Sequence, residues 1–242
     1  MCRRFVLDLD WEALAAGLDI ADDNIDRDDL PEPSYNMAPG HTIAVVAQGR
    51  DGARHLAGAR WSLVPAWSRT DVLPYPTYNA RVESIASKPT FAASARSMRA
   101  LIPANGYYEW KGGTNGRPFY FHADDDHALY MAGLFSWWRR SLGAPWLLTA
   151  TIVTCPATDG PASVHDRMPL LVPDDFVGPW LDRSSDCTDM LDDLRKQGTE
   201  LSRSLRFHEV APLPDPAETV HNNDPKLIRP ISRNTGTPAL LF

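Results

Sequence analysis

Prolines are spread along the whole chain, and they limit how long any helix or strand in it can be. The 242 residues include 21 prolines and only 15 glycines. A proline inside a helix removes a backbone hydrogen bond, and within a sheet it is tolerated only at edges, strand starts or bulges. We therefore predict many turns and short strands rather than long helices. A hydrophobic content of 43% is enough to build a real core.

Short apolar runs between turn residues predict a β-rich fold. The predicted strands cover residues 42–47, 55–61, 106–110, 119–122, 129–135, 146–154 and 205–210. Spacing or composition predicts short helices over 11–20, 82–87, 91–98, 173–181 and 186–194, and a turn over 36–40. We find no internal repeat, low-complexity block or clean linker. The pattern predicts one α+β domain over residues 1–242.

Composition and missing motifs exclude several classes of protein. Cys2, Cys155 and Cys187 are few and widely spaced, which argues against a disulfide framework or a zinc site and favours a reducing cytosol. No apolar run approaches a membrane span, and the start lacks the apolar core of a signal peptide. Phosphate-cradling glycine loops, G-x-S-x-G and H-E-x-x-H are absent. We therefore expect a cytoplasmic protein with no metal, cofactor or membrane partner.

The charge distribution leaves room for a limited contact with nucleic acid. The net charge is −7, which speaks against a general nucleic-acid coat. Between residues 79 and 117 the balance reverses, with basic residues outnumbering Glu83 and Glu109. A local basic face fits a specific phosphate contact. It fits an ordinary solvated surface equally well.

Cys2 is singled out by its position. Its side chain is small, so we expect Met1 to be removed, which gives Cys2 a free α-amine beside its thiol. Both groups titrate near pH 8 and are partly nucleophilic at neutral pH. This 1,2-aminothiol can condense with an aldehyde to an imine and close to a thiazolidine ring, or attack an acyl group as a thiolate. The alternative is a small buried hydrophobic residue near a chain end.

Two polar residues stand out in the middle of the chain. Asn79 shares a face with Arg81 if the segment is extended, which makes a donor-rich site for an anion or a carbonyl oxygen. Asn79 could instead be the N-cap of a helix, with Glu83 a surface acid. Glu109 sits in an aromatic segment, where burial would raise its pKa toward the range useful for acid–base catalysis. Its alternative is a structural salt bridge with a nearby arginine.

A loop and a group of aromatic residues complete the candidates. His165 and Arg167 precede Pro169 in a loop of a composition that often carries function; a satisfied surface or core histidine is the alternative. The aromatic residues near the polar motifs are Trp61, Trp67, Tyr75, Tyr78 and Trp110. Aromatic residues among basic ones suit stacking on unpaired bases, although core packing is the more frequent role of any single one of them.

Several motifs occur in a fixed order along the chain: MC (1–2) with RF (4–5), YNMAP (35–39), WSLVPAW (61–67), NARVE (79–83), KPTF (88–91), LIPANGYYEW (101–110), AGL (132–134) and HDRMP (165–169). Together they resemble the motifs of the SOS-response-associated peptidase (SRAP) family, which crosslinks to abasic sites in single-stranded DNA. The resemblance covers about residues 2–232. It implies a single domain with a curved, barrel-like, mostly antiparallel sheet and flanking short helices.

The resemblance also implies the chemistry. Cys2 would capture the ring-opened aldehyde of an abasic sugar as a thiazolidine, in a single-turnover reaction that shields the lesion during the DNA damage response. Asn79 would hydrogen-bond near the junction, Glu109 would transfer protons, and His165 would act as acid and base at the sugar. Lyase activity at the abasic site and thiol-dependent autopeptidase activity are further implications. The implied partner is single-stranded DNA with abasic sites, bound by a nucleoid-associated monomer.

The resemblance assigns DNA contacts residue by residue. Arg4, Arg81 and Arg167 would hold phosphates, and Pro39, Trp67, Tyr75 and Trp110 would stack against or wedge beside bases. This chain departs from the family at Arg3, where the family usually has glycine. A side chain there narrows the pocket or adds a phosphate contact.

Two other functions use the same residues. In a cysteine-type N-terminal nucleophile peptidase or amidase, Cys2 attacks an amide and Asn79 serves the oxyanion. In a non-covalent single-stranded DNA-binding module, Cys2 is inert. The three hypotheses differ in substrate: the first needs an aldehyde, the second an amide, and the third is unaffected by Cys2→Ala.

Overall fold

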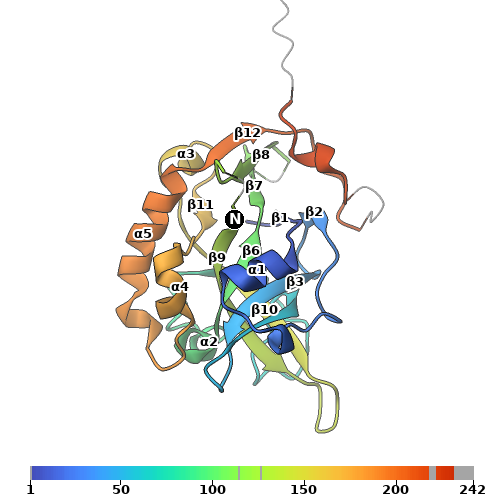
Figure 1. Ribbon diagram of the computed structural model, residues 1–242. Coiled ribbons are helices and arrows are strands. Elements are labelled where there is room, and N and C mark those ends of the chain that lie inside the picture. Colours follow the sequence, from blue (N-terminus) through green and yellow to red (C-terminus); the bar gives the residue numbers. More distant parts are fainter. Residues whose placement is uncertain (1, 114, 126, 218–221, 232–242) are drawn as a thin grey trace, which may run out of the picture.

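The computed structural model describes residues 2–113, 115–125, 127–217 and 222–231 (Figure 1). Met1, whose removal we predict, and residue 232, the end of the predicted core, lie outside the described residues. Five strands close into a barrel in the order β10-β4-β3-β6-β9, with β9 pairing back to β10. These strands are β3 (Thr42–Gln48), β4 (Arg54–Trp61), β6 (Arg99–Ala104), β9 (Leu129–Trp138) and β10 (Leu147–Pro156).

Two short strands extend the barrel at β10. β5 (Asn79–Arg81) runs parallel to β10, and β11 (Arg167–Pro169) runs antiparallel to it. The pairing of β4 with β10 is also parallel, whereas the remaining barrel pairs are antiparallel. The connections that carry β5 and β11 therefore bring distant parts of the sequence to one strand.

A second sheet joins the two ends of the chain. Its order is β12 (Arg206–Glu209), β8 (Arg117–His122), β7 (Gly106–Lys111), β1 (Arg4–Leu7) and β2 (Ser34–Met37). β6 leads into β7 through Asn105, whose amide side chain bonds Asp8 at the end of β1. This link connects the second sheet to the barrel.

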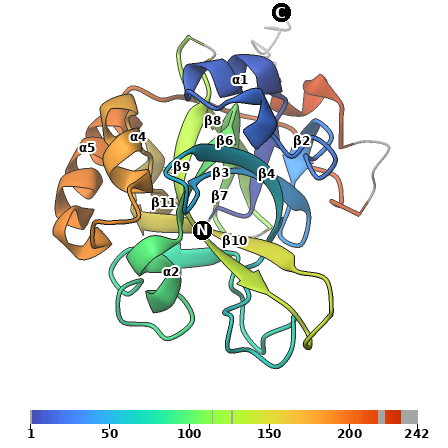
Figure 2. The same ribbon diagram turned by 60° about the horizontal axis from the view of Figure 1, so that its bottom comes forward.

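Short helices flank the sheets. They are α1 (Trp11–Gly17), η1 (Asp22–Asn24), α2 (Ala92–Ser97), α3 (Asp159–Ala162), α4 (Asp174–Leu181), η2 (Cys187–Asp189), α5 (Leu191–Arg203) and η4 (Pro225–Ile228). Figures 1 and 2 show α4 and α5 together on one side of the barrel. α1 begins at the Asp10 side chain, which accepts from the backbone N–H groups of Glu12 and Ala13. No helix within the described ranges is long and apolar enough to span a membrane.

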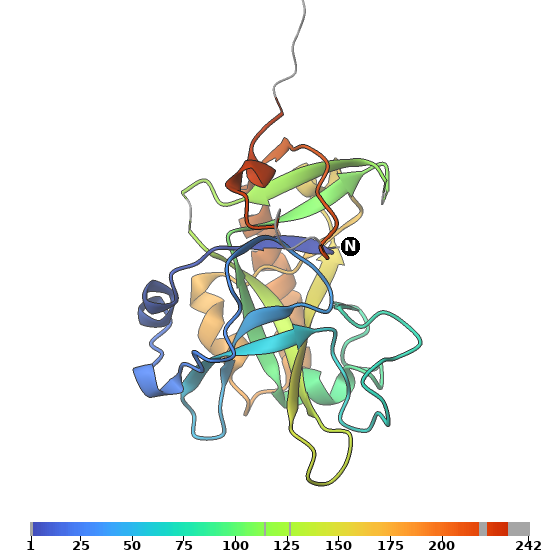
Figure 3. The same ribbon diagram turned by 90° about the vertical axis from the view of Figure 1, so that its right-hand side faces the viewer.

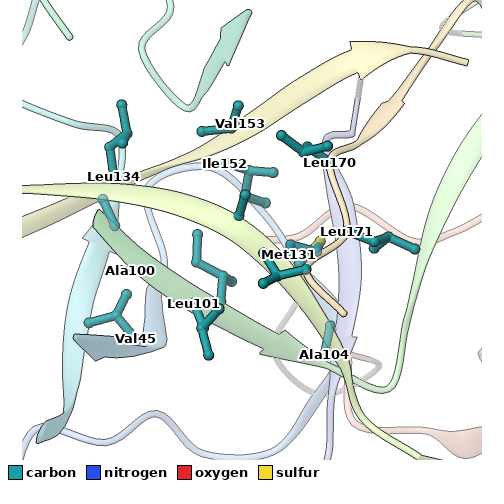
Figure 4. Packing of buried hydrophobic residues seen from close by; sticks show 14 of the residues in the cluster. Val45, Ala100, Leu101, Ala104, Met131, Leu134, Ile152, Val153, Leu170 and Leu171 are labelled. Carbon is teal, nitrogen blue, oxygen red and sulfur yellow. The ribbon is translucent and has the colours of Figure 1, made fainter. Parts of the chain in front are cut away.

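The core fills the barrel and continues under α4. Figure 4 shows Leu101 of β6, Met131 of β9 and Ile152 of β10 gathered with Leu171, all of them buried. Burying a side chain of this size contributes roughly 1.5–3 kcal/mol. These contacts hold β10 rigidly, and β10 in turn positions β5 and β11. The single α+β domain with a barrel-like sheet and flanking short helices is confirmed.

Four local predictions need correction. Residues 82–87 form hydrogen-bonded turns rather than a helix, since buried Val82 and Ile85 are β-branched residues of low helix propensity. Asn36 and Met37 belong to β2, so the turn starts later than predicted. The helix predicted over 186–194 is η2 followed by α5, which runs nine residues further. β6 was not predicted, because Pro103 lies inside it.

Candidate functional site

Cys2 lies just before β1, at the junction of the two sheets, and its side chain is fully buried. Figures 1 and 3 show the start of β1 between β7 and the barrel strands. Strict alternation along β1 would place Cys2 on the same face as Arg4. The strand begins only at Arg4, so the side chain of Cys2 does not follow the alternation of β1. It belongs instead to the same core cluster as Phe5 and Leu7. Burial fits the structural interpretation of Cys2 as well as the chemical one.

Asn79 holds the backbone of Cys2. Its side-chain Nδ2 donates to the carbonyl oxygen of Cys2 at 2.6 Å, across 77 positions of sequence. Asn79 is placed there by the parallel pairing of β5 with β10, in which it lies opposite Ile152. Its Oδ1 is buried without a hydrogen-bond partner among the described residues. The alternative of a helix N-cap is wrong, since Asn79 starts a strand and residues 82–87 after that strand form turns.

Glu109 is buried on the strand next to β1. Only 3% of it is exposed, and burial raises the pKa of its carboxyl to about 7. Burial and the charge of Glu109 both raise the pKa of the Cys2 thiol well above its usual range. The charge of Glu109 therefore acts on the Cys2 thiol. Near neutral pH the carboxyl of Glu109 is available in both its protonated and its ionised form, as acid–base catalysis requires.

His165 lies at the entry to β11. Its Nδ1 accepts from the backbone N–H of Arg167 at 3.0 Å and lies 2.8 Å from Oδ1 of Asp166. A neutral ring accepts at Nδ1 and carries its proton on Nε2; the contact with Asp166 becomes an ion pair only in the imidazolium. Burial lowers the pKa of His165, and Asp166 is 86% exposed. The neutral form with an Nε2–H donor therefore predominates at pH 7.

The predicted phosphate-binding arginines differ in what they contact. Arg4 donates to Oδ1 of Asn36 at 2.5 Å and to the carbonyl of Pro214 at 3.3 Å. Arg167 is 9% exposed and donates from both terminal nitrogens to the carboxylate of Glu83, at 2.6 and 3.0 Å. Arg81 is exposed. Of the three guanidinium groups, Arg81 is the most accessible to a phosphate.

The predicted aromatic contacts form two groups. Trp67 and Tyr75 are 59% and 45% exposed, and their polar atoms bond neighbouring residues, Pro89 and Thr90. Because these partners are consecutive in the sequence, we refer to the two exposed rings together as the Trp67–Tyr75 surface. Trp110 is half-buried, with the guanidinium carbon of Arg3 5.5 Å from its ring centroid.

The remaining candidates in this group, Trp61 and Pro39, belong to the body of the fold. Trp61 is fully buried and donates from Nε1 to the carbonyl of Tyr78. Pro39 is half-buried, one residue before Gly40, whose φ of +94° makes the turn to β3.

The basic stretch over 79–117 does not form one continuous face. Arg99 is 1% exposed and donates to backbone carbonyls that include those of Ala95 and Trp180. Arg117 pairs with Glu209 on the second sheet. The charge balance along the sequence therefore overstates the basic surface near the site.

Sequence reasoning missed two neighbours of Cys2. Tyr107 is buried on the same face of β7 as Glu109, stacked on Phe121 at 4.9 Å, and its hydroxyl oxygen has no hydrogen-bond partner in the described residues. Alternation along β7 would have identified it. Arg3 was noted only as a departure from the family motif, and nothing in the sequence places its side chain over Trp110.

A separate cavity of about 1080 Å³ lies at the other end of the barrel strands. Val45, Phe135, Trp137, Trp146 and Arg183 are among the residues that line it. No predicted site residue lines this cavity. The candidate site is therefore the junction around Cys2.

Comparison with known proteins identifies the family. The family model described as SOS response associated peptidase (SRAP) matches residues 1–213, and the chain belongs to this family. Abasic site processing protein YoqW of Bacillus subtilis is 32% identical over 235 residues, covering 94% of this chain and 99% of that protein. Abasic site processing protein YedK of Escherichia coli is 30% identical over 240 residues, covering 96% and 100%.

A solved structure matches the fold. The X-ray structure of a protein from Bacteroides thetaiotaomicron superposes with a TM-score of 0.72 at 19% identity, covering 96% of this chain and all of that one. At this identity the likeness concerns the fold alone.

Proposed function

We propose that the protein captures abasic sites in single-stranded DNA covalently through Cys2. The observation that carries the proposal is the hydrogen bond from Asn79 to the carbonyl of the buried Cys2, together with the buried Glu109, whose charge acts on the Cys2 thiol. The names of the relatives from Bacillus subtilis and Escherichia coli support the substrate class. The proposal requires removal of Met1, because the backbone nitrogen of Cys2 is an amide until then.

The reaction needs no oxidant or reductant. The α-amine of Cys2 adds to the C1′ aldehyde of the ring-opened sugar, and loss of one water gives an imine. The Cys2 sulfur then bonds to C1′, and its proton passes to the imine nitrogen as the five-membered ring closes. The net result is a thiazolidine and one water molecule.

Glu109 supplies the proton transfers in this scheme. In its protonated form it donates to the hydroxyl that leaves as water, and as the carboxylate it accepts the thiol proton during ring closure. Both steps are served by a pKa of about 7. Because the thiol pKa is raised, its proton leaves only as sulfur attacks. Glu109 can take up that proton at the same moment.

Asn79 and His165 complete the site. Asn79 fixes the backbone of Cys2, and its Oδ1, which has no partner among the described residues, can accept from the amine or the developing carbinolamine. His165 presents an Nε2–H donor suited to the sugar oxygen that is released on ring opening, and it serves in reversal of the crosslink. DNA bases would stack on the Trp67–Tyr75 surface, which is worth roughly 1–3 kcal/mol per base.

The peptidase alternative fits this geometry less well. Attack on an amide needs the thiolate, and burial beside Glu109 disfavours that form of Cys2. Nδ2 of Asn79, the donor proposed for an oxyanion, is already engaged by the Cys2 carbonyl. Aldehyde capture begins with the amine and needs neither a free thiolate nor an oxyanion hole.

A crosslinking assay tests the proposal. The purified protein is mixed with a single-stranded oligonucleotide that contains one abasic site, and the products are separated on a denaturing gel with and without borohydride. We expect wild type to give a shifted band that needs no borohydride. Cys2→Ser keeps the amine but lacks the thiol, so its band should appear only after borohydride traps the imine.

Two controls make the result decisive. A variant with lysine inserted between Met1 and Cys2 retains an internal Cys2, and it should give no thiazolidine. Intact mass confirms whether Met1 is absent from the wild type. No wild-type band from protein that lacks Met1 would refute covalent capture; binding that survives Cys2→Ala unchanged, with no crosslink, would favour the non-covalent module.

A further inference from the structure

We propose that Arg3 is a phosphate-binding residue of this site, which holds a phosphodiester oxygen of the strand next to the sugar at Cys2. The inference rests on the proposed function for the identity of the strand. It concerns the one arginine that directly follows the reactive residue.

The guanidinium of Arg3 is available to an anion. Its contact with the ring of Trp110 is the only short-range contact of this group found within residues 2–113, 115–125, 127–217 and 222–231, where its side chain forms no hydrogen bond or ion pair. A guanidinium over an aromatic face keeps its N–H donors in its own plane. Trp110 therefore restricts where the group lies without using the donors that a phosphate needs.

Two of the three predicted phosphate ligands are already engaged. Arg4 bonds Asn36 and the carbonyl of Pro214. Arg167 bonds both carboxylate oxygens of Glu83 and the carbonyl of Thr154. A phosphate would have to displace these partners, whereas no such partner is found at Arg3 within the described residues.

The charge of Arg3 also acts on the reactive groups. Burial is the main influence on the pKa values of Glu109 and His165, and the positive charge of Arg3 acts on both. Arg3 thus lies within electrostatic reach of the two groups proposed to transfer protons. A phosphate bound there would belong to the captured nucleotide or its neighbour.

The test measures binding without covalent chemistry. The probe is a single-stranded oligonucleotide with a tetrahydrofuran abasic analogue, which has the phosphates but no aldehyde. Fluorescence anisotropy gives Kd over a range of salt concentrations for wild type, Arg3→Gln and Arg3→Lys. Each phosphate contact on a single strand contributes about 0.7 to the slope of log K on log salt.

Arg139→Gln is the matched control. Arg139 also stacks on a tryptophan, with its guanidinium carbon 4.4 Å from the ring of Trp146. Arg139 directly follows β9, in the connection between β9 and β10. In Figures 1 and 3 this connection extends away from the start of β1. The control removes the same charge and the same kind of ring contact at a distance from the site.

We expect Arg3→Gln to weaken binding about fivefold at low salt and to make the slope shallower by about 0.7, with Arg3→Lys and Arg139→Gln near wild type. A wild-type slope for Arg3→Gln, or an equal change in Arg139→Gln, would overturn the inference. Arg3→Met serves as the second charge-free variant if Arg3→Gln does not fold. Since the probe lacks an aldehyde, a failure of covalent capture leaves this result intact, and the reverse also holds.

Discussion

Glu109 is a single buried residue that provides acid–base chemistry to the proposed site and lowers the stability of the fold. A carboxylate that is removed from water is unstable unless its partners replace the lost hydration, and burial raises the pKa of Glu109 from its ordinary value of 4.5 to about 7. Below pH 4.5 the group is protonated in both the folded and the unfolded chain. Between pH 4.5 and 7 only the unfolded chain releases its proton, so stability falls as pH rises through this range.

Glu109→Gln should therefore stabilise the protein above pH 7. Each pH unit between the two pKa values corresponds to about 1.4 kcal/mol, which gives a gain of up to about 3 kcal/mol at pH 8 and little at pH 4.5. Urea unfolding at both pH values measures the difference. The exposed Glu200→Gln is the control, and an equal effect at both pH values for Glu109→Gln would contradict this account.

The same substitution should slow covalent capture. Loss of a positioned acid–base group typically costs about 10²–10⁴-fold in rate, and we expect about 100-fold for Glu109→Gln together with loss of the pH dependence near 7. Rates of crosslink formation between pH 5 and 9 provide the measurement. A wild-type rate and pH profile would show that Glu109 has no part in the reaction.

Asn79 contributes to the proposed site by positioning Cys2. Asn79→Ala removes the 2.6 Å hydrogen bond to the Cys2 carbonyl, which should reduce stability by about 1 kcal/mol and capture by about tenfold or more, since Cys2 is no longer held. Thermal unfolding and single-turnover kinetics separate the two effects. Loss of stability with an unchanged rate would make Asn79 a purely structural residue.

At the scale of elements, Arg167 ties three segments together around β10. It lies in β11, bonds Thr154 of β10, and pairs with Glu83 just beyond β5. His165 precedes β11 and Asn79 starts β5, so this connection fixes the distance between two proposed site residues.

Arg167→Ala should reduce stability by about 2–3 kcal/mol, since it leaves Glu83 and the carbonyl of Thr154 without this partner. Arg206 forms a similar two-point pair with Asp124, but both side chains are more than 60% exposed. Arg206→Ala should therefore change stability by less than about 1 kcal/mol. Equal losses in the two variants would contradict a structural role for Arg167; a shallower salt slope of DNA binding in Arg167→Ala would support its phosphate contact.

Elements with a clear local signal could be predicted from the sequence, and those fixed by distant partners could not. The apolar run of β10 and the aromatic residues of β7 identify those strands directly. β6 contains Pro103 and is stabilised by pairing with β3 and β9. The aromatic setting of Glu109 predicted its burial and raised pKa, but the engagement of Arg4 by Asn36 depends on contacts 32 positions apart.

At the scale of the whole molecule, the segment after β12 is tied to the N-terminal strands. Asn222 accepts from Asn36 at 2.7 Å through its side chain, and its carbonyl accepts from the backbone N–H of Tyr35 at 2.8 Å. Pro214 accepts from Asn36 and from Arg4. Pro214 and Asn222 both lie beyond residue 213, where the family match ends, so β1 and β2 are held in part by chain beyond that match.

Asn222→Ala should reduce stability by about 1–3 kcal/mol, because Asn36 is fully buried and loses a partner. It should also speed proteolysis of the segment that follows β12. Asn223→Ala is the control, since Asn223 is exposed. Unfolding and limited proteolysis measure both effects, and indistinguishable results for the two variants would show that this connection contributes little.

The intact mass of the wild-type crosslink tests the central claim most directly. Protein and abasic oligonucleotide react without reductant, and mass spectrometry weighs the product. We predict a mass equal to the protein without Met1 plus the oligonucleotide minus one water, with digestion locating the bond on Cys2. A product that retains Met1, or one whose linkage lies on another residue, would contradict capture by the amine and thiol of Cys2.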